Sequence, residues 1–138
     1  MATKGPSNKY GNINGTATVK INFPYAVPKY IGLNPKDHMK KHFDDFGVDN
    51  ETDYIAKAVN FGNDVDRVNY DSFVDHGGTT YKYNKQNNAL LIVSKEGNII
   101  TYFKPRYENG PKKGQLNWNY FNFQRKVKID DERTFGKR

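Results

Sequence analysis

The sequence contains no cysteine, which excludes disulfide bonds and cysteine-based zinc sites. Long apolar runs are also missing. The longest, residues 89–93, is the size of one strand and far too short to cross a membrane as a helix. The N-terminus carries no signal-peptide pattern. We therefore expect no membrane span, and the length of 138 residues suits one domain.

Hydrophobic residues make up only 36% of the chain, while aromatic residues alone account for 14%. The core must therefore be built largely from Tyr and Phe, which are residues typical of strands. This composition favours a sheet-rich fold.

Basic residues outnumber acidic ones by 22 to 15, giving a net charge of +7. The excess is concentrated between residues 103 and 129, where aromatic residues are interleaved. This combination suits a polyanion with exposed bases, such as RNA. A solvated basic edge over core aromatics would have the same composition. The residues concerned are Lys104, Arg106, Lys112, Lys113, Arg125, Lys126 and Lys128, with Trp118, Tyr120, Phe121 and Phe123.

The N-terminal part of the chain predicts a leader rather than a packed region. Residues 1–15 are rich in Gly, Asn, Ser and Lys, which is typical of a flexible segment. Apolar and polar residues then alternate over 16–23 and predict a strand. We therefore divide the chain into a leader (1–30), a folded domain (31–128) and a charged tail (129–138).

Two helices are predicted next. The first covers residues 35–46, with Asn34 as its N-cap, Pro35 in the first helical position and Gly47 as its end. The second runs from about 51 to 61, is capped by Asn50 or Thr52, and closes at Gly62. Tyr54, Ile55, Ala58 and Val59 are expected to form its buried face.

The remaining pattern predicts an antiparallel meander, so the fold class is α+β, with N-terminal helices packed on a small antiparallel sheet. Turn residues separate the apolar runs, and Pro105 ends the last of them. Residues 115–126 are ambiguous, and their aromatic spacing slightly favours a strand. The expected strands are 68–74, 79–83, 89–94 and 99–104.

The first predicted helix has two distinct faces. At helical spacing Met39, Phe43 and Phe46 form an apolar stripe, and the opposite face carries His38, Lys41, His42 and Asp45. Histidine has the pKa for acid–base catalysis, and lysine can stabilise charge on a phosphate. The pair His38 and His42 also has a spacing that zinc can use, although no third ligand is placed by the sequence. A solvated helix face remains a third interpretation.

The strand 99–104 offers groups that could complete such a site. Strict alternation puts Thr101 and Phe103 on one side and Ile100, Tyr102 and Lys104 on the other. Any half-buried strand has a similar composition. His76 lies in a turn with two glycines and is expected to be exposed rather than catalytic.

Two segments resemble the colicin D-like tRNA ribonuclease toxin domains, which are C-terminal toxin domains of bacterial polymorphic and contact-dependent inhibition systems. These segments are Lys41-His42 followed by Asp45-Phe46-Gly47, and YKYNKQNNALLIVSKEGNIITYFKP at 81–105. The resemblance covers roughly residues 36–124. It implies a barnase/colicin D-like α+β nuclease that cuts tRNA without a metal or other cofactor. It also implies delivery within a larger effector, action in the target-cell cytoplasm, and an acidic immunity protein that inhibits the domain in its maker; we expect a monomer.

The resemblance also implies roles for individual residues. His42 matches the catalytic histidine, Lys41 a lysine beside it, and Thr101 an active-site serine. Phe103 falls where the family has a tryptophan, and Lys104 matches a basic residue. The family also uses a lysine three residues before its histidine, where this chain has Met39. Either Lys40 or a residue such as Arg106 replaces it, or the cleavage site and rate differ. We add Tyr102 and Tyr120 as substrate-binding candidates, since Tyr120 lies in an aromatic closing segment like that of related toxins.

The predicted function is therefore a metal-independent endoribonuclease that leaves 2′,3′-cyclic phosphate and 5′-hydroxyl ends. One alternative is a non-catalytic basic module that binds nucleic acid or an acidic protein. Another is a metal-dependent nuclease.

Overall fold

The computed structural model describes residues 20, 21 and 23–130. The predicted flexible segment 1–15 therefore lies outside the described residues, as do most of the predicted strand 16–23 and residues 131–138 of the charged tail. Within the described part of the leader, residues 24–27 are exposed, whereas Ile21 packs against the rest of the molecule. Ile21 is 6% exposed, and its backbone N–H donates to the Gly62 carbonyl at 2.8 Å.

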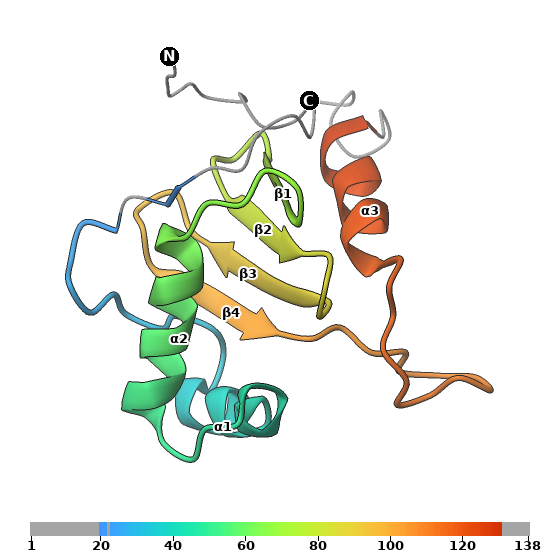
Figure 1. The fold of residues 1–138 in the computed structure, drawn as a ribbon, viewed down its shortest axis with the longest axis horizontal. Coiled ribbons are helices and arrows are strands. Elements are labelled where there is room, and N and C mark those ends of the chain that lie inside the picture. The colour runs from blue at the N-terminus through green and yellow to red at the C-terminus, as the bar shows by residue number, and fades with distance from the viewer. Residues whose placement is uncertain (1–19, 22, 131–138) are drawn as a thin grey trace.

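Four antiparallel strands form the centre of the molecule (Figure 1). They are β1 (Tyr70–Val74), β2 (Thr80–Asn84), β3 (Ala89–Val93) and β4 (Ile99–Phe103), in the order β1-β2-β3-β4. Each strand pairs with its neighbour in sequence, as the turn residues predicted. With the helices that accompany this sheet, the α+β prediction is confirmed.

The helices pack against the sheet on both of its faces. α1 (Pro35–Lys40), the 3₁₀ helix η1 (Phe43–Phe46) and α2 (Glu51–Asn63) precede the sheet in sequence. α3 (Tyr120–Arg125) follows it and continues into the π-helical turn η2 (Lys126–Asp130). None of the helices in the described ranges is long and apolar enough to cross a membrane.

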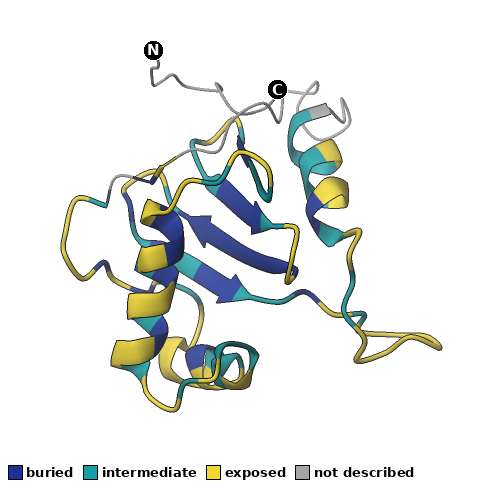
Figure 2. Ribbon diagram, viewed as in Figure 1, coloured by how far each residue is buried: buried dark blue, intermediate teal, exposed yellow. Residues whose placement is uncertain are grey.

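β3 is buried along its whole length and divides the core into two layers (Figure 2). Ala89, Leu91 and Val93 pack in the layer that contains Tyr54 of α2. Leu90 and Ile92 pack in the layer that contains Phe121 of α3. The continuous apolar run 89–93 therefore reflects a strand covered on both faces.

The first predicted helix is interrupted. α1 ends after Lys40, and a turn separates it from η1. Asn34 adopts a left-handed conformation with φ 48°, so its side chain makes no capping bond, and its backbone carbonyl accepts from His38 N–H instead. Gly47 ends η1 with φ 65°, in agreement with the prediction.

The second predicted helix forms where expected, but it is longer. The Asn50 side chain accepts from Asp53 N–H and caps α2, and the helix continues through Gly62 to Asn63. Gly62 is therefore not its end. It is buried because the ring of Phe23 lies over it.

The preference for a strand in 115–126 was wrong, because residues 120–125 form α3. Phe121 is 1% exposed, packed on Phe73 and Tyr83, while Phe123 is 60% exposed. A helix allows this one-sided burial of closely spaced aromatics.

Lys82 is a buried cation in the sheet with no exposed surface. Its Nζ donates to the Gly62 carbonyl at 3.1 Å and to the Asp64 carbonyl, so it satisfies acceptors at the C-terminal end of α2. The rings of Phe61 and Tyr70 lie 5.1 and 5.4 Å from Nζ. Burial lowers the pKa of Lys82 to about 8, while Asp64 opposes that shift. This lysine joins α2 to the middle of the sheet.

The packing at Gly62 predicts that replacing this helical glycine by alanine lowers the stability of the protein, whereas the same replacement in an open helix usually raises it. Gly62→Ala would place a Cβ 2.7 Å from the Phe23 ring and 3.3 Å from Leu91. We expect a loss of about 1–3 kcal/mol from overpacking, instead of the roughly 1 kcal/mol gain typical of Gly→Ala in an open helix. Urea unfolding would measure it. Asn60→Ala, at an exposed position of the same helix, is the control and should change stability by less than about 0.5 kcal/mol. A Gly62→Ala protein more stable than wild type would contradict this packing.

Candidate active site

A cleft of about 360 Å³ lies between the α1–η1 segment and the C-terminal end of β4. Tyr120, the first residue of α3, closes one side of it. Histidine, hydroxyl, cationic and carboxylate groups all line this one space: His38, Lys41, His42, Asp45, Thr101, Phe103, Lys104, Pro105, Arg106, Glu108 and Tyr120.

The α1–η1 segment is held in place by its apolar stripe. Met39 is 3% exposed, and Phe43 and Phe46 pack beside it around Tyr54 of α2. Phe46 also stacks on Tyr102 of β4, with ring centroids 3.9 Å apart. The predicted two-faced arrangement therefore survives the break in the helix, and the polar face is turned toward β4.

Asp45 connects the helical segment to the end of β4. One carboxylate oxygen accepts from the Lys104 backbone N–H at 3.2 Å, and the other accepts from Arg106 Nη2 at 3.1 Å. The Asp45 side chain is 12% exposed, so these contacts compensate for its partial burial. His42 Nδ1 lies 3.9 Å from the same carboxylate.

The two histidines of α1–η1 lie side by side, with ring centroids 5.2 Å apart. The pKa of His42 is lowered to about 4, mainly by burial and also by the neighbouring His38 and Lys41, while Asp45 opposes the shift. Burial also lowers the pKa of His38, with Lys41 contributing. Both imidazoles are thus neutral at pH 7, and the contact between His42 and Asp45 is not an ion pair at that pH.

A hydroxyl pair lies beside His38. Thr101 Oγ1 is 3.5 Å from His38 Nε2, and it accepts a hydrogen bond from the Tyr30 hydroxyl at 3.4 Å. The Tyr30 ring meets the His38 ring edge-on, with centroids 5.6 Å apart. Gly32 makes room for this arrangement, since a Cβ there would lie 2.9 Å from His38 Nδ1 and 2.7 Å from the Ile100 carbonyl.

Aromatic rings line the other side of the histidines. The Phe103 ring lies 5.4 Å from that of His42, and Tyr120 meets Phe103 edge-on at 5.8 Å. Lys104 extends its Nζ to 5.8 Å from the Phe46 ring. The cleft therefore offers aromatic surface next to its cations.

Most of the site residues predicted from the sequence line this cleft, and two do not. Tyr102 is 6% exposed and packs in the α2 layer on the opposite face of β4, where burial raises its pKa, so it cannot contact a ligand in the cleft. Lys40, an exposed residue of α1, does not line the cleft either. The predicted residues that do line it are His42, Lys41, Thr101, Lys104, Phe103, Arg106 and Tyr120.

Some cleft groups had been given no role from the sequence. The helical spacing suggests His38 as a possible zinc ligand with His42 but assigns it no catalytic role, although it lines the same cleft. No local sequence pattern marks Tyr30 and Gly32 as site residues, because the segment before α1 reaches the cleft only through tertiary packing. Its backbone pairs with β4 through hydrogen bonds between residues 29–31 and Ile99.

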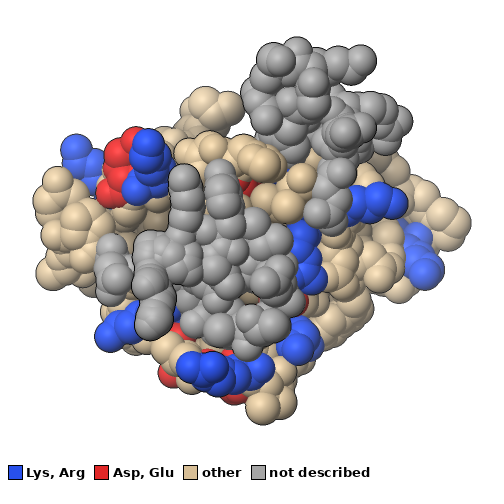
Figure 3. Space-filling view, turned by 90° about the horizontal axis from the view of Figure 1, so that it is seen from above, with Lys and Arg blue, Asp and Glu red and all other residues tan. Residues whose placement is uncertain are grey.

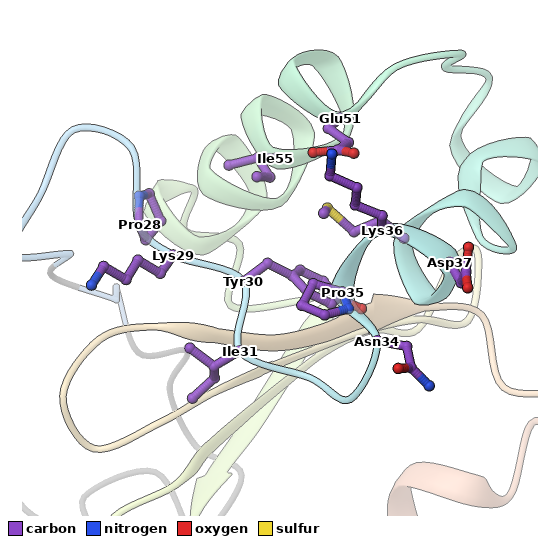
Figure 4. Close-up of a pocket in the computed structure, with 11 residues that line it drawn as sticks. Pro28, Lys29, Tyr30, Ile31, Asn34, Pro35, Lys36, Asp37, Glu51 and Ile55 are labelled. Atoms are coloured by element: carbon purple, nitrogen blue, oxygen red, sulfur yellow. The ribbon is translucent and has the colours of Figure 1, made fainter.

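A second, larger hollow of about 780 Å³ lies on the other side of α1 (Figure 4). Pro28 to Ile31, the start of α1 and the α2 residues Glu51 and Ile55 surround it. No histidine lines it. It therefore lacks the imidazole groups that the smaller cleft brings together.

Net charge by itself does not identify the site. On the face seen in Figure 3, Lys and Arg side chains are scattered around the visible surface, and acidic groups lie beside some of them. The cleft stands out instead by the convergence of histidines and a hydroxyl with its cations. Within the described ranges, no group of three or more His, Asp or Glu side chains is placed to hold a metal ion.

The geometry predicts how the histidines titrate. By NMR, the His42 ring should titrate near pH 4 and that of His38 below 6.5. Lys41→Met should raise both pKa values, because it removes a cation that disfavours protonation. Lys40→Met, which removes a neighbouring charge outside the cleft, is the matched control and should have the smaller effect. A His42 pKa of 6.5 or above would contradict the burial described here.

No protein-family model matches this chain, and neither a curated protein nor a solved structure does. The colicin D-like resemblance therefore stays a prediction, and the case for function depends on the chemistry of the cleft.

Proposed function

We propose that the protein is a ribonuclease that cleaves RNA by attack of the 2′-hydroxyl on the adjacent phosphate, without a metal ion. One observation carries the proposal: two histidines with lowered pKa values, a threonine hydroxyl and several cationic side chains line the same cleft. The reaction needs a base, an acid and positive charge near the phosphate, and these residue types supply all three.

In the proposed reaction His42, neutral at pH 7, accepts the proton of the 2′-hydroxyl while the 2′-oxygen attacks phosphorus. The bond from phosphorus to the 5′-oxygen then breaks, and His38, whose imidazolium form the negative charge of the bound phosphate favours, donates a proton to the leaving oxygen. The products are a 2′,3′-cyclic phosphate and a 5′-hydroxyl. His42 afterwards releases its proton to solvent and His38 takes one up, so the enzyme returns to its starting state.

Thr101 is suited to position His38 or to donate to a phosphate oxygen, because its own oxygen already accepts from Tyr30. Lys41 and Lys104 line the cleft and would stabilise the negative charge that develops on the phosphorane oxygens. Phe103 and Tyr120 provide ring surfaces for a base beside the scissile phosphate. Arg106 pairs with Asp45 and lines the cleft, where it would supply the positive charge of the lysine that the family has at the position of Met39.

The finer part of the proposal comes from the resemblance to colicin D-like domains. It makes tRNA the substrate and the protein a bacterial toxin, delivered within a larger effector and acting in the cytoplasm of a target cell. An acidic immunity protein would then block the cationic cleft, since charge complementarity favours fast and specific association.

Cleavage of total tRNA is the direct test. We expect new ends carrying 2′,3′-cyclic phosphate and 5′-hydroxyl groups, formed equally with and without EDTA. His42→Ala and His38→Ala should each lower the rate by about 10²–10⁴, the usual contribution of one acid–base group. His76→Ala removes the third histidine, in the β1–β2 turn away from the cleft, and should leave the rate unchanged. Cleavage that stops with EDTA would refute the metal-independent mechanism. RNA binding without new ends would favour the non-catalytic alternative.

The histidine pKa values predict the pH dependence of kcat/KM, which reports the free enzyme. Below about pH 4 His42 is protonated and cannot act as the base. Above the lowered pKa of His38 the acid has lost its proton. The profile should therefore be bell-shaped with its maximum below pH 6.5, and Lys41→Met should move the maximum upward. A profile that rises through pH 7 to 8 would exclude these roles for the two histidines.

A further inference from the structure

Between β4 and α3 the chain leaves the body of the molecule as a projecting arm, which Figure 1 shows as the orange-red loop beside α3. We define this basic arm as residues 106–116. Its two sides are joined by the pairing of Arg106 with Leu116 and by hydrogen bonds between Tyr107 and residues 114 and 115, both 2.9 Å long. Gly110 and Gly114, with φ 83° and 88°, allow the tight turns at its tip. The arm is thus a folded element.

The arm is anchored to the sheet by a buried side chain. Asn88 has no exposed surface, and its Nδ2 donates to the carbonyls of Pro105 and Asn117, each at 3.2 Å. The Tyr83 hydroxyl in turn donates to the Asn88 side-chain oxygen. Both ends of the arm are therefore fixed relative to β2 and β3.

Arg106 links the arm directly to the cleft. Its Nη2 donates to Asp45 at 3.1 Å, and its Nη1 donates to the Gly114 carbonyl at 3.0 Å. The guanidinium thus connects the carboxylate beside His42 to the far side of the arm. The arm begins at the mouth of the cleft and keeps a defined position there.

The surface of the arm is cationic and exposed. Every residue from Glu108 to Gln115 is exposed, including Lys112 and Lys113, and Glu108 is its one acidic residue. Lys112 Nζ lies 5.6 Å from the Tyr107 ring. Just beyond the arm Trp118, 47% exposed, adds aromatic surface. Cations next to exposed aromatic rings fit a single-stranded nucleic acid, whose phosphates and bases alternate at close range.

We propose that the basic arm binds the RNA strand beyond the scissile phosphate, with Lys112 and Lys113 contacting phosphates and Trp118 stacking on a base. This inference rests on the proposed ribonuclease function and deepens it. The substrate would be an RNA polymer held at several nucleotides, rather than any short phosphodiester that fits the cleft. The RNA needs to be single-stranded where it crosses the arm, since stacking on Trp118 requires an unpaired base.

The test begins with binding of a single-stranded 2′-O-methyl RNA, which lacks the attacking hydroxyl and cannot be cleaved. Trp118 is the one tryptophan in the chain, so quenching of its fluorescence reports binding next to the arm. The double variant Lys112→Ala/Lys113→Ala should bind about tenfold more weakly. The slope of log K against log salt should also fall by about 1.4, since each lost contact with a single-strand phosphate removes about 0.7.

The control is the double variant Lys57→Ala/Lys95→Ala, which removes the same charge from the exposed face of α2 and from the β3–β4 turn. It should bind like the wild type. Affinity and salt slope of the arm variant equal to those of this control would overturn the proposal, as would a wild-type protein that does not bind the RNA. If the arm variant binds RNA like the wild type but binds poly-glutamate more weakly, the arm is a contact for an acidic protein. That result would also overturn the proposal.

Cleavage assays separate this inference from the proposed function. The arm variant should cleave a dinucleoside phosphate at the wild-type rate, while its kcat/KM for a long single-stranded RNA falls about tenfold. Equal loss on both substrates would contradict a role confined to the distant strand. If the wild type cleaves no RNA, the ribonuclease proposal fails, while binding of the 2′-O-methyl RNA still decides whether the arm holds a nucleic acid.

Discussion

The carboxylate of Asp45 lies where three parts of the chain meet. One oxygen accepts from the backbone of Lys104 at the end of β4, and the other accepts from the guanidinium of Arg106, which opens the basic arm. Its own backbone belongs to η1, directly after His42. Because both oxygens are engaged elsewhere, the carboxylate stabilises an imidazolium only weakly across 3.9 Å, and burial decides the protonation state of His42. The contacts of Asp45 with Lys104 and Arg106, which assemble the cleft, therefore also leave His42 neutral.

The cleft lies at the edge of a sheet that is otherwise fully used for the core. β3 is buried on both faces and leaves no room for a polar site there. At the outer edge of β4 the backbone around residues 29–31 pairs with Ile99, and α1 with η1 covers the strand farther along. The lysine of β2, Lys82, fixes the C-terminal end of α2 from inside the sheet. The helical segment that carries the histidines thus rests on a rigid support, and its polar face needs no packing partner of its own.

Local patterns in the sequence were sufficient for the meander and for α2, because each strand and turn is specified by neighbouring residues. The same was true of the two faces of α1–η1, which depend only on helical spacing. Local patterns were not sufficient for α3, where aromatic residues typical of strands form a helix that buries Phe121 on one side. A bulge between Ile92 and Val93 also broke the alternation in β4, so Ile100 joins the α3 layer instead of the α2 layer. Within the cleft, contacts such as those of Arg106 with Asp45, 61 residues apart, and of Tyr30 with Thr101 depend on tertiary packing that no local pattern contains.

The histidines are neutral because the cleft penalises their protonated forms, and an anionic substrate would reverse that penalty. Lys41 and the burial of both rings disfavour an additional positive charge in the free protein. A phosphodiester bound among Lys41, Lys104 and the two rings brings a negative charge within a few ångströms, which favours the imidazolium form. His38, nearer to solvent and to the Thr101 hydroxyl, has the smaller penalty to overcome and would gain its proton first, while His42 remains the base. The acid and the base would then be distinguished by their surroundings rather than by their chemistry, and at pH 7 the acid would be charged only while a phosphate occupies the cleft.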